Sequence, residues 1–252
     1  MGHLNERGWI NVATLVVYLP LLVGTLATLL RQGFRLKSFY YLLVFVLVKY
    51  VGAAMTIDVQ LKNNASLYTP AAILSTIVLT PLIMSVGGIV SLKTATSPDQ
   101  KPLITSRTTR LTHLSHLAVL ASLALGIVGG LDVFSTTPDP NSNGKTYMRA
   151  AAGLAAGALF LIAVVVATNM ANARLLGGWY VRLYTAVAFV ALPLLAARVA
   201  YTVGVAATVD TTRTQVFNPL TGSWVLYLCL AWLPEVLLGY VLVAVGLMKP
   251  RS

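Results

Sequence analysis

The sequence predicts an all-α membrane protein, a bundle of seven helices that each cross the bilayer. Of the 252 residues, 57% are apolar and only 10% are charged, whereas soluble domains average about 45 to 50% and about 25%. With so few polar residues to cover its surface, the chain needs lipid around it rather than water. Seven apolar blocks also follow one another with short connections, so we expect one transmembrane domain over residues 1–252.

Each apolar block has the length of about 20 residues or more that a helix needs to cross the hydrocarbon core. We expect helices at residues 9–30, 38–60, 70–92, 111–133, 147–172, 183–207 and 223–248. The first block follows a short charged segment and is long enough to span, so we interpret it as a helix and not as a cleaved signal peptide. Four of these helices contain a proline, at Pro20, Pro81, Pro193 and Pro234. Because a proline removes one backbone hydrogen bond, each predicts a local bend in its helix.

The loop charges predict that the N-terminus lies outside and the C-terminus in the cytoplasm. Eleven Lys and Arg residues fall in loops one, three and five and in the C-terminal tail, against five in the segments on the other side. Loops rich in Lys and Arg stay on the cytoplasmic side. The second loop is then outside, where the sequon at Asn64 makes that residue a candidate glycosylation site in a eukaryotic host. We therefore expect a multi-pass protein of the plasma membrane or an endomembrane.

The net charge of +11 indicates contact with membrane lipids and not with nucleic acid. Nucleic-acid-binding domains gather Lys and Arg with aromatic residues on one face. Here the cations are scattered between apolar blocks, a distribution that fits anionic lipid head groups at the membrane surface.

Two short motifs have a packing interpretation. Gly153 and Gly157, at four-residue spacing in an alanine-rich helix, allow another helix to approach closely. We interpret them as packing inside the bundle, with a homodimer interface as the alternative. His113 and His116 share a helix face, but no third ligand accompanies them, so we expect a polar patch, no metal site and no cofactor.

Three ionisable residues lie inside apolar blocks, namely Lys49, Arg198 and Glu235. At about 1.5 Å per residue, each lies roughly 14 to 18 Å from the outer end of its helix, near the middle of the bilayer. A charge at this depth costs about 2.5 to 3.5 kcal/mol if it faces lipid, so we expect all three to point into the bundle. There Glu235 would pair with Arg198 or Lys49 as an ion-paired lock. Two cations leave a surplus positive charge, which a neutral Lys49 or an anionic ligand would relieve.

Aromatic residues accompany two of these charges. Tyr201 follows Arg198 by one turn and Trp232 precedes Glu235 by one turn, so the members of each pair share a helix face. We expect a cavity that binds or transports a lipid-like or amphipathic molecule, lined by Lys49, Arg198, Tyr201, Trp232 and Glu235. Plain packing of the two aromatic side chains is the alternative.

Two other functions stay open at this point. A membrane enzyme would use Glu235 as a general acid on an isoprenoid or similar apolar substrate, unless Arg198 holds the carboxylate ionised. A receptor-like sensor would need a cytoplasmic partner, and the inner loops are short. Retinal proteins are excluded, because the seventh helix has no lysine before Lys249 at its end.

Residues spread over nearly the whole chain carry a family resemblance. They are Gly33-Phe34, Lys49, Gly52, Gly129-Gly130-Leu131-Asp132, Pro193, Arg198, Tyr201 and Glu235. In these residues the chain resembles a group of uncharacterised fungal seven-helix integral membrane proteins, which implies the same seven-helix fold. Lys49 stands where that group is expected to carry arginine, which keeps the charge but loses the planar fork of donors.

The architecture is also similar to two better-known fungal classes. Similarity to lipid-translocating exporter-type proteins implies a lipid ligand. Similarity to the small membrane-bound terpene cyclases of secondary metabolism implies an intramembrane carboxylate as proton donor, for which Glu235 is the central candidate. The chain lacks the tryptophan-glutamate pair that those cyclases carry in their second helix, and this absence counts against the cyclase.

Overall fold

The computed structural model describes residues 4–32, 37–62, 65–90, 106–134, 143–173, 182–183, 185–209, 216–218, 220 and 222–248. Within these ranges the chain is helical and has no β-strand. The α-helices are α1 (Glu6–Gln32), α2 (Lys37–Lys62), α3 (Tyr68–Ile77), α4 (Leu79–Val90), α5 (Ser106–Val133), α6 (Gly144–Ala173), α8 (Leu192–Ala207), α9 (Trp224–Tyr227) and α10 (Leu233–Met248). A short 3₁₀ helix and two π-helical segments complete the order, η1 (Ala65–Leu67), η2 (Val187–Ala191) and η3 (Leu228–Trp232).

Seven helical segments in the described ranges are long and apolar enough to cross a membrane. They are Glu6–Arg31, Ser38–Lys62, Tyr68–Val90, Thr108–Val133, Gly144–Met170, Val187–Ala207 and Trp224–Met248. Each overlaps one of the seven predicted blocks, so the predicted all-helical fold with seven candidate spans is confirmed. The third candidate span consists of α3 and α4, the sixth of η2 and α8, and the seventh of α9, η3 and α10.

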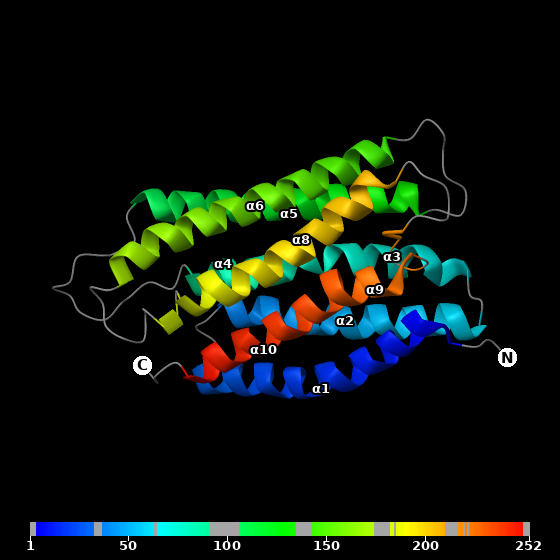
Figure 1. The fold of residues 1–252 in the computed structure, drawn as a ribbon, viewed down its shortest axis with the longest axis horizontal. Helices are drawn as coiled ribbons and strands as arrows, with labels where there is room; N and C mark the ends of the chain where they lie inside the picture. Colours follow the sequence, from blue (N-terminus) through cyan, green and yellow to red (C-terminus); the bar gives the residue numbers. More distant parts are fainter. Residues whose placement is uncertain are drawn as a thin grey trace.

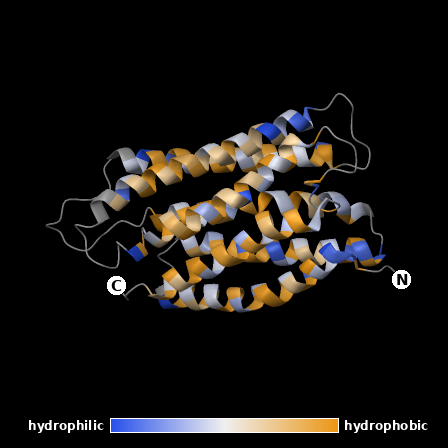
Figure 2. Cartoon of the chain, viewed as in Figure 1, coloured by the Kyte–Doolittle hydropathy of each residue, from blue (hydrophilic) through white to orange (hydrophobic). Residues whose placement is uncertain are grey.

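The helices run along one common direction, and α1 begins at the end of the bundle opposite to the end where α10 stops (Figure 1). On one side α5 pairs with α6, and on the other α1 pairs with α2. Between these pairs, α8 packs against α6 and α10, and α4 packs against α2 and α5. Hydrophobic residues predominate along the helices, whereas most strongly hydrophilic residues lie near the helix ends (Figure 2).

The buried apolar side chains form two clusters. The larger cluster includes Tyr18, Phe39 and Phe45. The smaller one includes Tyr201 and Tyr227 and draws on α3, α8 and α9. Trp232 packs against both clusters, so the two meet at the level of η3, next to the predicted charges.

Two of the predicted proline sites coincide with wide helical turns. The segment η2 precedes Pro193 and the segment η3 precedes Pro234. A proline cannot donate to the carbonyl four residues earlier, which is Phe189 in one case and Leu230 in the other, and both lie within the π-helical segments. The α-helical hydrogen-bond pattern is therefore altered in the turn before Pro234, and the altered segment ends at Trp232, one turn before Glu235.

The α5–α6 pair depends on a close backbone approach at the end of α5. A Cβ added to Gly129 would lie 2.7 Å from the carbonyl oxygen of Gly144 and 2.9 Å from the amide nitrogen of Met148. A Cβ added to Gly130 would lie 3.0 Å from the Ile73 side chain of α3. The double glycine on which the family resemblance partly rests thus lets α5 pack tightly against α6 and α3.

Candidate functional site

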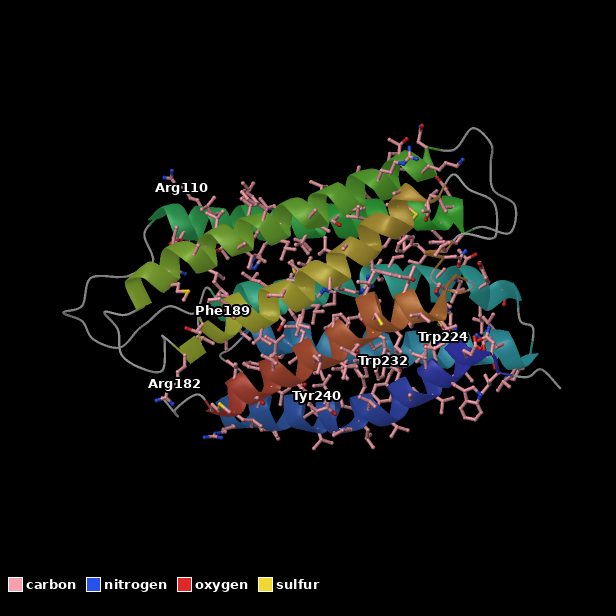
Figure 3. The ribbon with its side chains drawn as sticks, in the orientation of Figure 1. Arg110, Arg182, Phe189, Trp224, Trp232 and Tyr240 are labelled. Atoms are coloured by element: carbon pink, nitrogen blue, oxygen red, sulfur yellow. The ribbon has the colours of Figure 1, made fainter. Side chains whose placement is uncertain are left out.

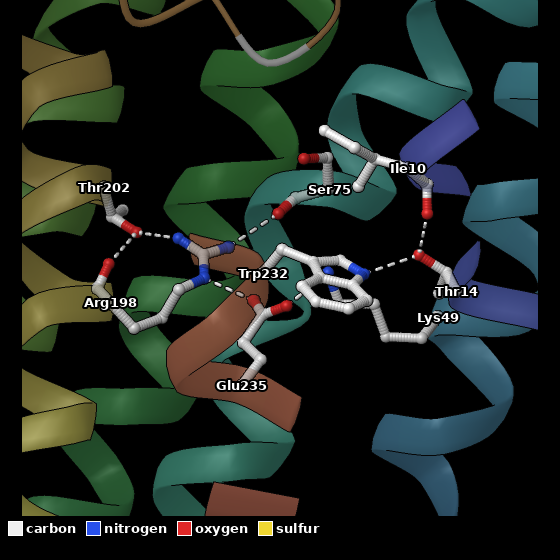
Figure 4. A network of polar contacts seen from close by, with 8 residues as sticks. All are labelled: Ile10, Thr14, Lys49, Ser75, Arg198, Thr202, Trp232 and Glu235. Atoms are coloured by element: carbon white, nitrogen blue, oxygen red, sulfur yellow. Dashed lines mark hydrogen bonds and ion pairs between the residues drawn. The ribbon is translucent and has the colours of Figure 1, made fainter. Parts of the chain in front are cut away.

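The three charges predicted inside the bundle meet at Glu235. In Figure 4, Arg198 of α8 donates from Nε to Oε1 of Glu235, and Lys49 of α2 forms an ion pair with Oε2. Glu235, which stands at the start of α10, is 0% exposed, Arg198 is 2% exposed and Lys49 is 7% exposed. Each carboxylate oxygen therefore has its own cation, and the carboxylate joins three helices.

Arg198 uses all three guanidinium nitrogens. Its Nη1 donates to the Thr202 hydroxyl at 2.8 Å, and its Nη2 donates to the carbonyl oxygen of Ser75 at 2.8 Å. Ser75 lies near the end of α3, where the third span is interrupted at Val78 before α4 begins. The planar fork of donors thus ties α8 to α3 and α10 at once, which a lysine at this position could not do.

The positive charge at this centre exceeds the negative charge. Two cations share one carboxylate, and a third buried cation, Arg7 of α1, is 4% exposed. The Arg7 guanidinium carbon lies 4.9 Å from the centre of the Tyr227 ring, and Lys49 Nζ lies 6.0 Å from the same ring. Both cations therefore flank one aromatic side chain, whose π face attracts positive charge.

A cavity of about 30 Å³ with both polar and apolar lining residues lies on the side of Lys49 toward the start of α1. That volume has room for about two water molecules. Its lining comes mainly from α1, α2 and α3 and consists of Arg7, Asn11, Thr14, Val48, Lys49, Gly52, Ala53, Thr56, Ala71, Leu74, Ser75, Leu220 and Tyr227. None of these described lining residues carries a carboxylate.

The cavity has a different lining from the predicted one. Of the five predicted lining residues, Lys49 alone lines this cavity. Arg198 and Glu235 lie behind Lys49 in the ion-pair network. The predicted meeting of the three charges is therefore confirmed, whereas the lining of a ligand cavity by Arg198, Tyr201, Trp232 and Glu235 stays a prediction.

The two predicted aromatic residues have packing roles in this structure. Tyr201 is buried, its ring lies 5.5 Å from the Arg198 guanidinium carbon, and its hydroxyl donates to the Phe217 carbonyl at 3.3 Å. Trp232 donates from its indole nitrogen to the Thr14 hydroxyl of α1 at 2.8 Å. Each aromatic thus holds a neighbouring segment against the network, in agreement with the packing alternative.

Sequence reasoning missed the contribution of α1. Arg7 stands at the first turn of its helix and was counted as an outer flanking cation. Arg7, Asn11 and Thr14 follow one another at four- and three-residue spacing, and all three side chains are buried. A polar stripe on one face of an otherwise apolar helix is the signal that could have identified α1 as one wall of the cavity.

The glycine motif of α6 does not pack inside the described bundle. Gly153 and Gly157 are both exposed, and a Cβ added to either would meet nothing within 4 Å. The interpretation that we favoured, packing within the bundle, is therefore wrong for these two positions. Both glycines lie on an outward face, which leaves the homodimer as a proposal that the single chain does not test.

The remaining candidates lie away from the cavity. His113 is exposed and His116 is half-buried, and the described ranges hold no group of three side chains suited to a metal ion. Asn64, the candidate glycosylation site, lies outside the described residues.

Comparison with known proteins identifies one family. The model of the family described as "Domain of unknown function (DUF7702)" matches residues 4–251, nearly the whole chain. No curated protein and no solved structure matches the chain.

Proposed function

The chain belongs to the DUF7702 family, and we propose that it binds or transports a lipid-like or amphipathic small molecule in a polar cavity within its helix bundle. One observation carries the proposal. Lys49 lines the cavity on one side and touches Glu235 on the other, so surplus positive charge faces a hollow among apolar helices. A buried charge that serves only to hold helices together needs no such hollow beside it.

The same geometry favours binding over acid catalysis. A general acid must carry a proton that it can deliver to the substrate. Each oxygen of Glu235 contacts a cation, and Glu235 does not line the cavity. Both carboxylate oxygens are thus occupied by cations and lie out of reach of a substrate in the cavity, which argues against the terpene-cyclase alternative.

We also propose that the protein sits in the plasma membrane or an endomembrane with its N-terminus outside and its C-terminus in the cytoplasm. Arg110 and Arg182 both lie at the end of the bundle where α10 stops (Figure 3), and Arg31 stands in the last turn of α1 at that end. Over the whole sequence, eleven Lys and Arg residues fall on this side against five on the other, and this excess supports a cytoplasmic assignment for that end.

Cysteine labelling tests this orientation. With Cys229, the single native cysteine, replaced by serine, one cysteine is placed at Lys62 or at Arg110, exposed positions at opposite ends of the bundle. We expect a membrane-impermeant maleimide to label Lys62→Cys on sealed right-side-out membranes, and Arg110→Cys only after permeabilisation. The opposite pattern would reverse the orientation.

The binding proposal is tested by the molecules that remain with the purified protein. Lipids and other small molecules extracted from wild type, Lys49→Met and Lys62→Met are quantified by mass spectrometry. Lys62 is an exposed lysine on the same helix and serves as the matched control. We expect a specific molecule to be retained by wild type and Lys62→Met and reduced about tenfold, equivalent to about 1.4 kcal/mol, in Lys49→Met. Full retention by a folded Lys49→Met protein would refute the proposal.

A further inference from the structure

Arg7 is a buried cation with unused hydrogen-bonding capacity. Its Nη2 donates to the carbonyl oxygen of Ser223 at 3.1 Å. Its Nε and Nη1 are buried and have no hydrogen-bond partner among the described residues. These two nitrogens carry three N–H groups between them, and even with the Tyr201 hydroxyl beside the guanidinium, part of this donor capacity awaits an acceptor. Arg7 lines the cavity, which is where an acceptor can reach it.

The other polar groups on the wall do not supply that acceptor. Asn11 donates to the Arg7 carbonyl at 2.9 Å, and the Thr56 hydroxyl donates to the Gly52 carbonyl at 2.8 Å. The Thr14 hydroxyl donates to the carbonyl of Ile10 and accepts from Trp232. These three side chains are engaged within their own helices or with a neighbour, so the charged groups that face the cavity are the cations Arg7 and Lys49, beside the hydroxyl groups of Ser75 and Tyr227.

Two cations without a lining carboxylate select a negatively charged ligand. The carboxylate nearest to Lys49, that of Glu235, is already shared with Arg198. Nothing of opposite charge among the described residues forms an ion pair with Arg7. A neutral ligand would leave Arg7, and the one surplus charge that Lys49 and Arg198 share around Glu235, uncompensated in an apolar surrounding. An oxyanion would accept charge-assisted hydrogen bonds from Arg7 and Lys49.

The size of the cavity limits what enters. A hollow of about 30 Å³ holds a group of a few oxygen atoms and not an alkyl chain. The lining residues that are only partly buried are Val48 and Gly52 of α2 and Leu74 and Ser75 of α3. An apolar tail attached to the bound group would therefore leave the bundle along the contact between α2 and α3.

Building on the proposed function, we infer that Arg7 and Lys49 together bind a small oxyanion, a carboxylate or phosphate group, carried by the lipid-like ligand. Arg7 receives it from the side of α1 and Lys49 from the side of α2, with the Tyr227 ring beside both cations. The anion neutralises the surplus charge that the Glu235 network leaves.

Calorimetric titration of the full-length protein in a neutral detergent tests this assignment. The probes are phosphatidic acid against diacylglycerol with the same chains, and palmitate against methyl palmitate at a pH where the acid is ionised. Inorganic phosphate and acetate are titrated alone. We expect each anionic lipid to bind at least about tenfold more tightly than its neutral counterpart, and the free anions to bind more weakly because they lack the tail.

The variants assign the preference to Arg7. We expect Arg7→Gln to abolish the preference for anionic lipids, Arg7→Lys to restore part of it, and Arg31→Gln to leave it unchanged. Arg31 is an exposed arginine at the opposite end of the same helix, so it controls for general attraction between charges. If Arg7→Gln proves unfolded in thermal denaturation, Lys49→Met takes its place, with Lys62→Met as its control.

The possible results separate this inference from the proposed function. Equal binding of anionic and neutral lipids would overturn the anion site while leaving lipid binding intact. Free phosphate or acetate could instead bind as tightly as the lipids and lose this binding in Arg7→Gln. That result would support the anion site and refute a lipid-like ligand. Binding of none of the probes would overturn the anion site, whereas a co-purifying neutral molecule would still support the proposed function.

Discussion

The α5–α6 pair and the helices around Glu235 are held together in two different ways, although both belong to one apolar bundle. In the described parts of α5 and α6 no charged residue is buried, and small residues such as Gly129 bring the backbones together. Around Glu235, three buried charges join α2, α8 and α10. Close packing is the ordinary means of helix association in lipid. The costlier ionic arrangement occurs where the cavity lies, which indicates a role beyond cohesion.

The largest effect is expected from Glu235→Gln, which breaks the ionic centre. The amide keeps the shape of the side chain but leaves Arg198 and Lys49 buried without a carboxylate. Removing one partner of a buried pair costs about 3 to 5 kcal/mol. We expect a loss of this order in thermal or denaturant unfolding in detergent, together with a lower yield of folded protein. Adding Lys49→Met to this variant should recover part of the loss, because one of the two unpaired cations is then gone.

The next effect is expected in the close-packed pair. Gly129→Ala places a methyl group within 3 Å of backbone atoms of Gly144 and Met148, which cannot rotate away. Overpacking of this kind costs about 1 to 3 kcal/mol. Gly126→Ala is the matched control one turn earlier on α5, since its Cβ would lie 3.9 Å from Ala151. Equal unfolding midpoints for the two variants would show that the α5–α6 contact is not as tight as we describe.

A smaller effect on stability is expected from Lys49→Met, although it alters the same ionic centre. The substitution leaves Arg198 and Glu235 as a balanced pair, with the Thr202 and Ser75 hydrogen bonds in place. We expect the free energy of unfolding to stay within about 1 kcal/mol of wild type, since an apolar group of similar volume can replace a buried charge at little cost. A loss as large as that of Glu235→Gln would instead make Lys49 part of a structural lock.

Sequence reasoning predicted those features that are forced by the lipid environment. The seven candidate spans follow from apolar length, and the meeting of Lys49, Arg198 and Glu235 follows from their similar positions along their helices and from the cost of a charge facing lipid. The position of the cavity does not follow from depth, because it depends on which side of the charged group is left unfilled. Arg7 escaped notice because a cation at the first turn of a helix resembles any flanking loop charge.

The outward direction of the α6 glycines was equally hidden in the sequence. Alanine, glycine and larger apolar residues of α6 are distributed over all faces of this helix. No polar stripe therefore marks which face is turned away from the bundle. A small-residue motif shows that a close approach is allowed, but not which partner makes it. Only the packed structure shows that Gly129 of α5 lies in a helix–helix contact, whereas Gly153 and Gly157 of α6 face outward.

The smallest effect on stability is expected from Gly153→Leu combined with Gly157→Leu, which tests the outward face of α6. Nothing lies within 4 Å of a Cβ at either position, and the neighbouring Phe160 is 67% exposed. New leucines would therefore contact lipid or detergent and would raise helix propensity, so we expect the monomer to unfold at or slightly above the wild-type midpoint. Light scattering coupled to size exclusion measures the oligomeric state in parallel. If wild type is a dimer and the variant a monomer, the face is an interface between two copies. Destabilisation of a monomeric variant would contradict the outward placement and restore the glycines to the interior, where Gly129 stands.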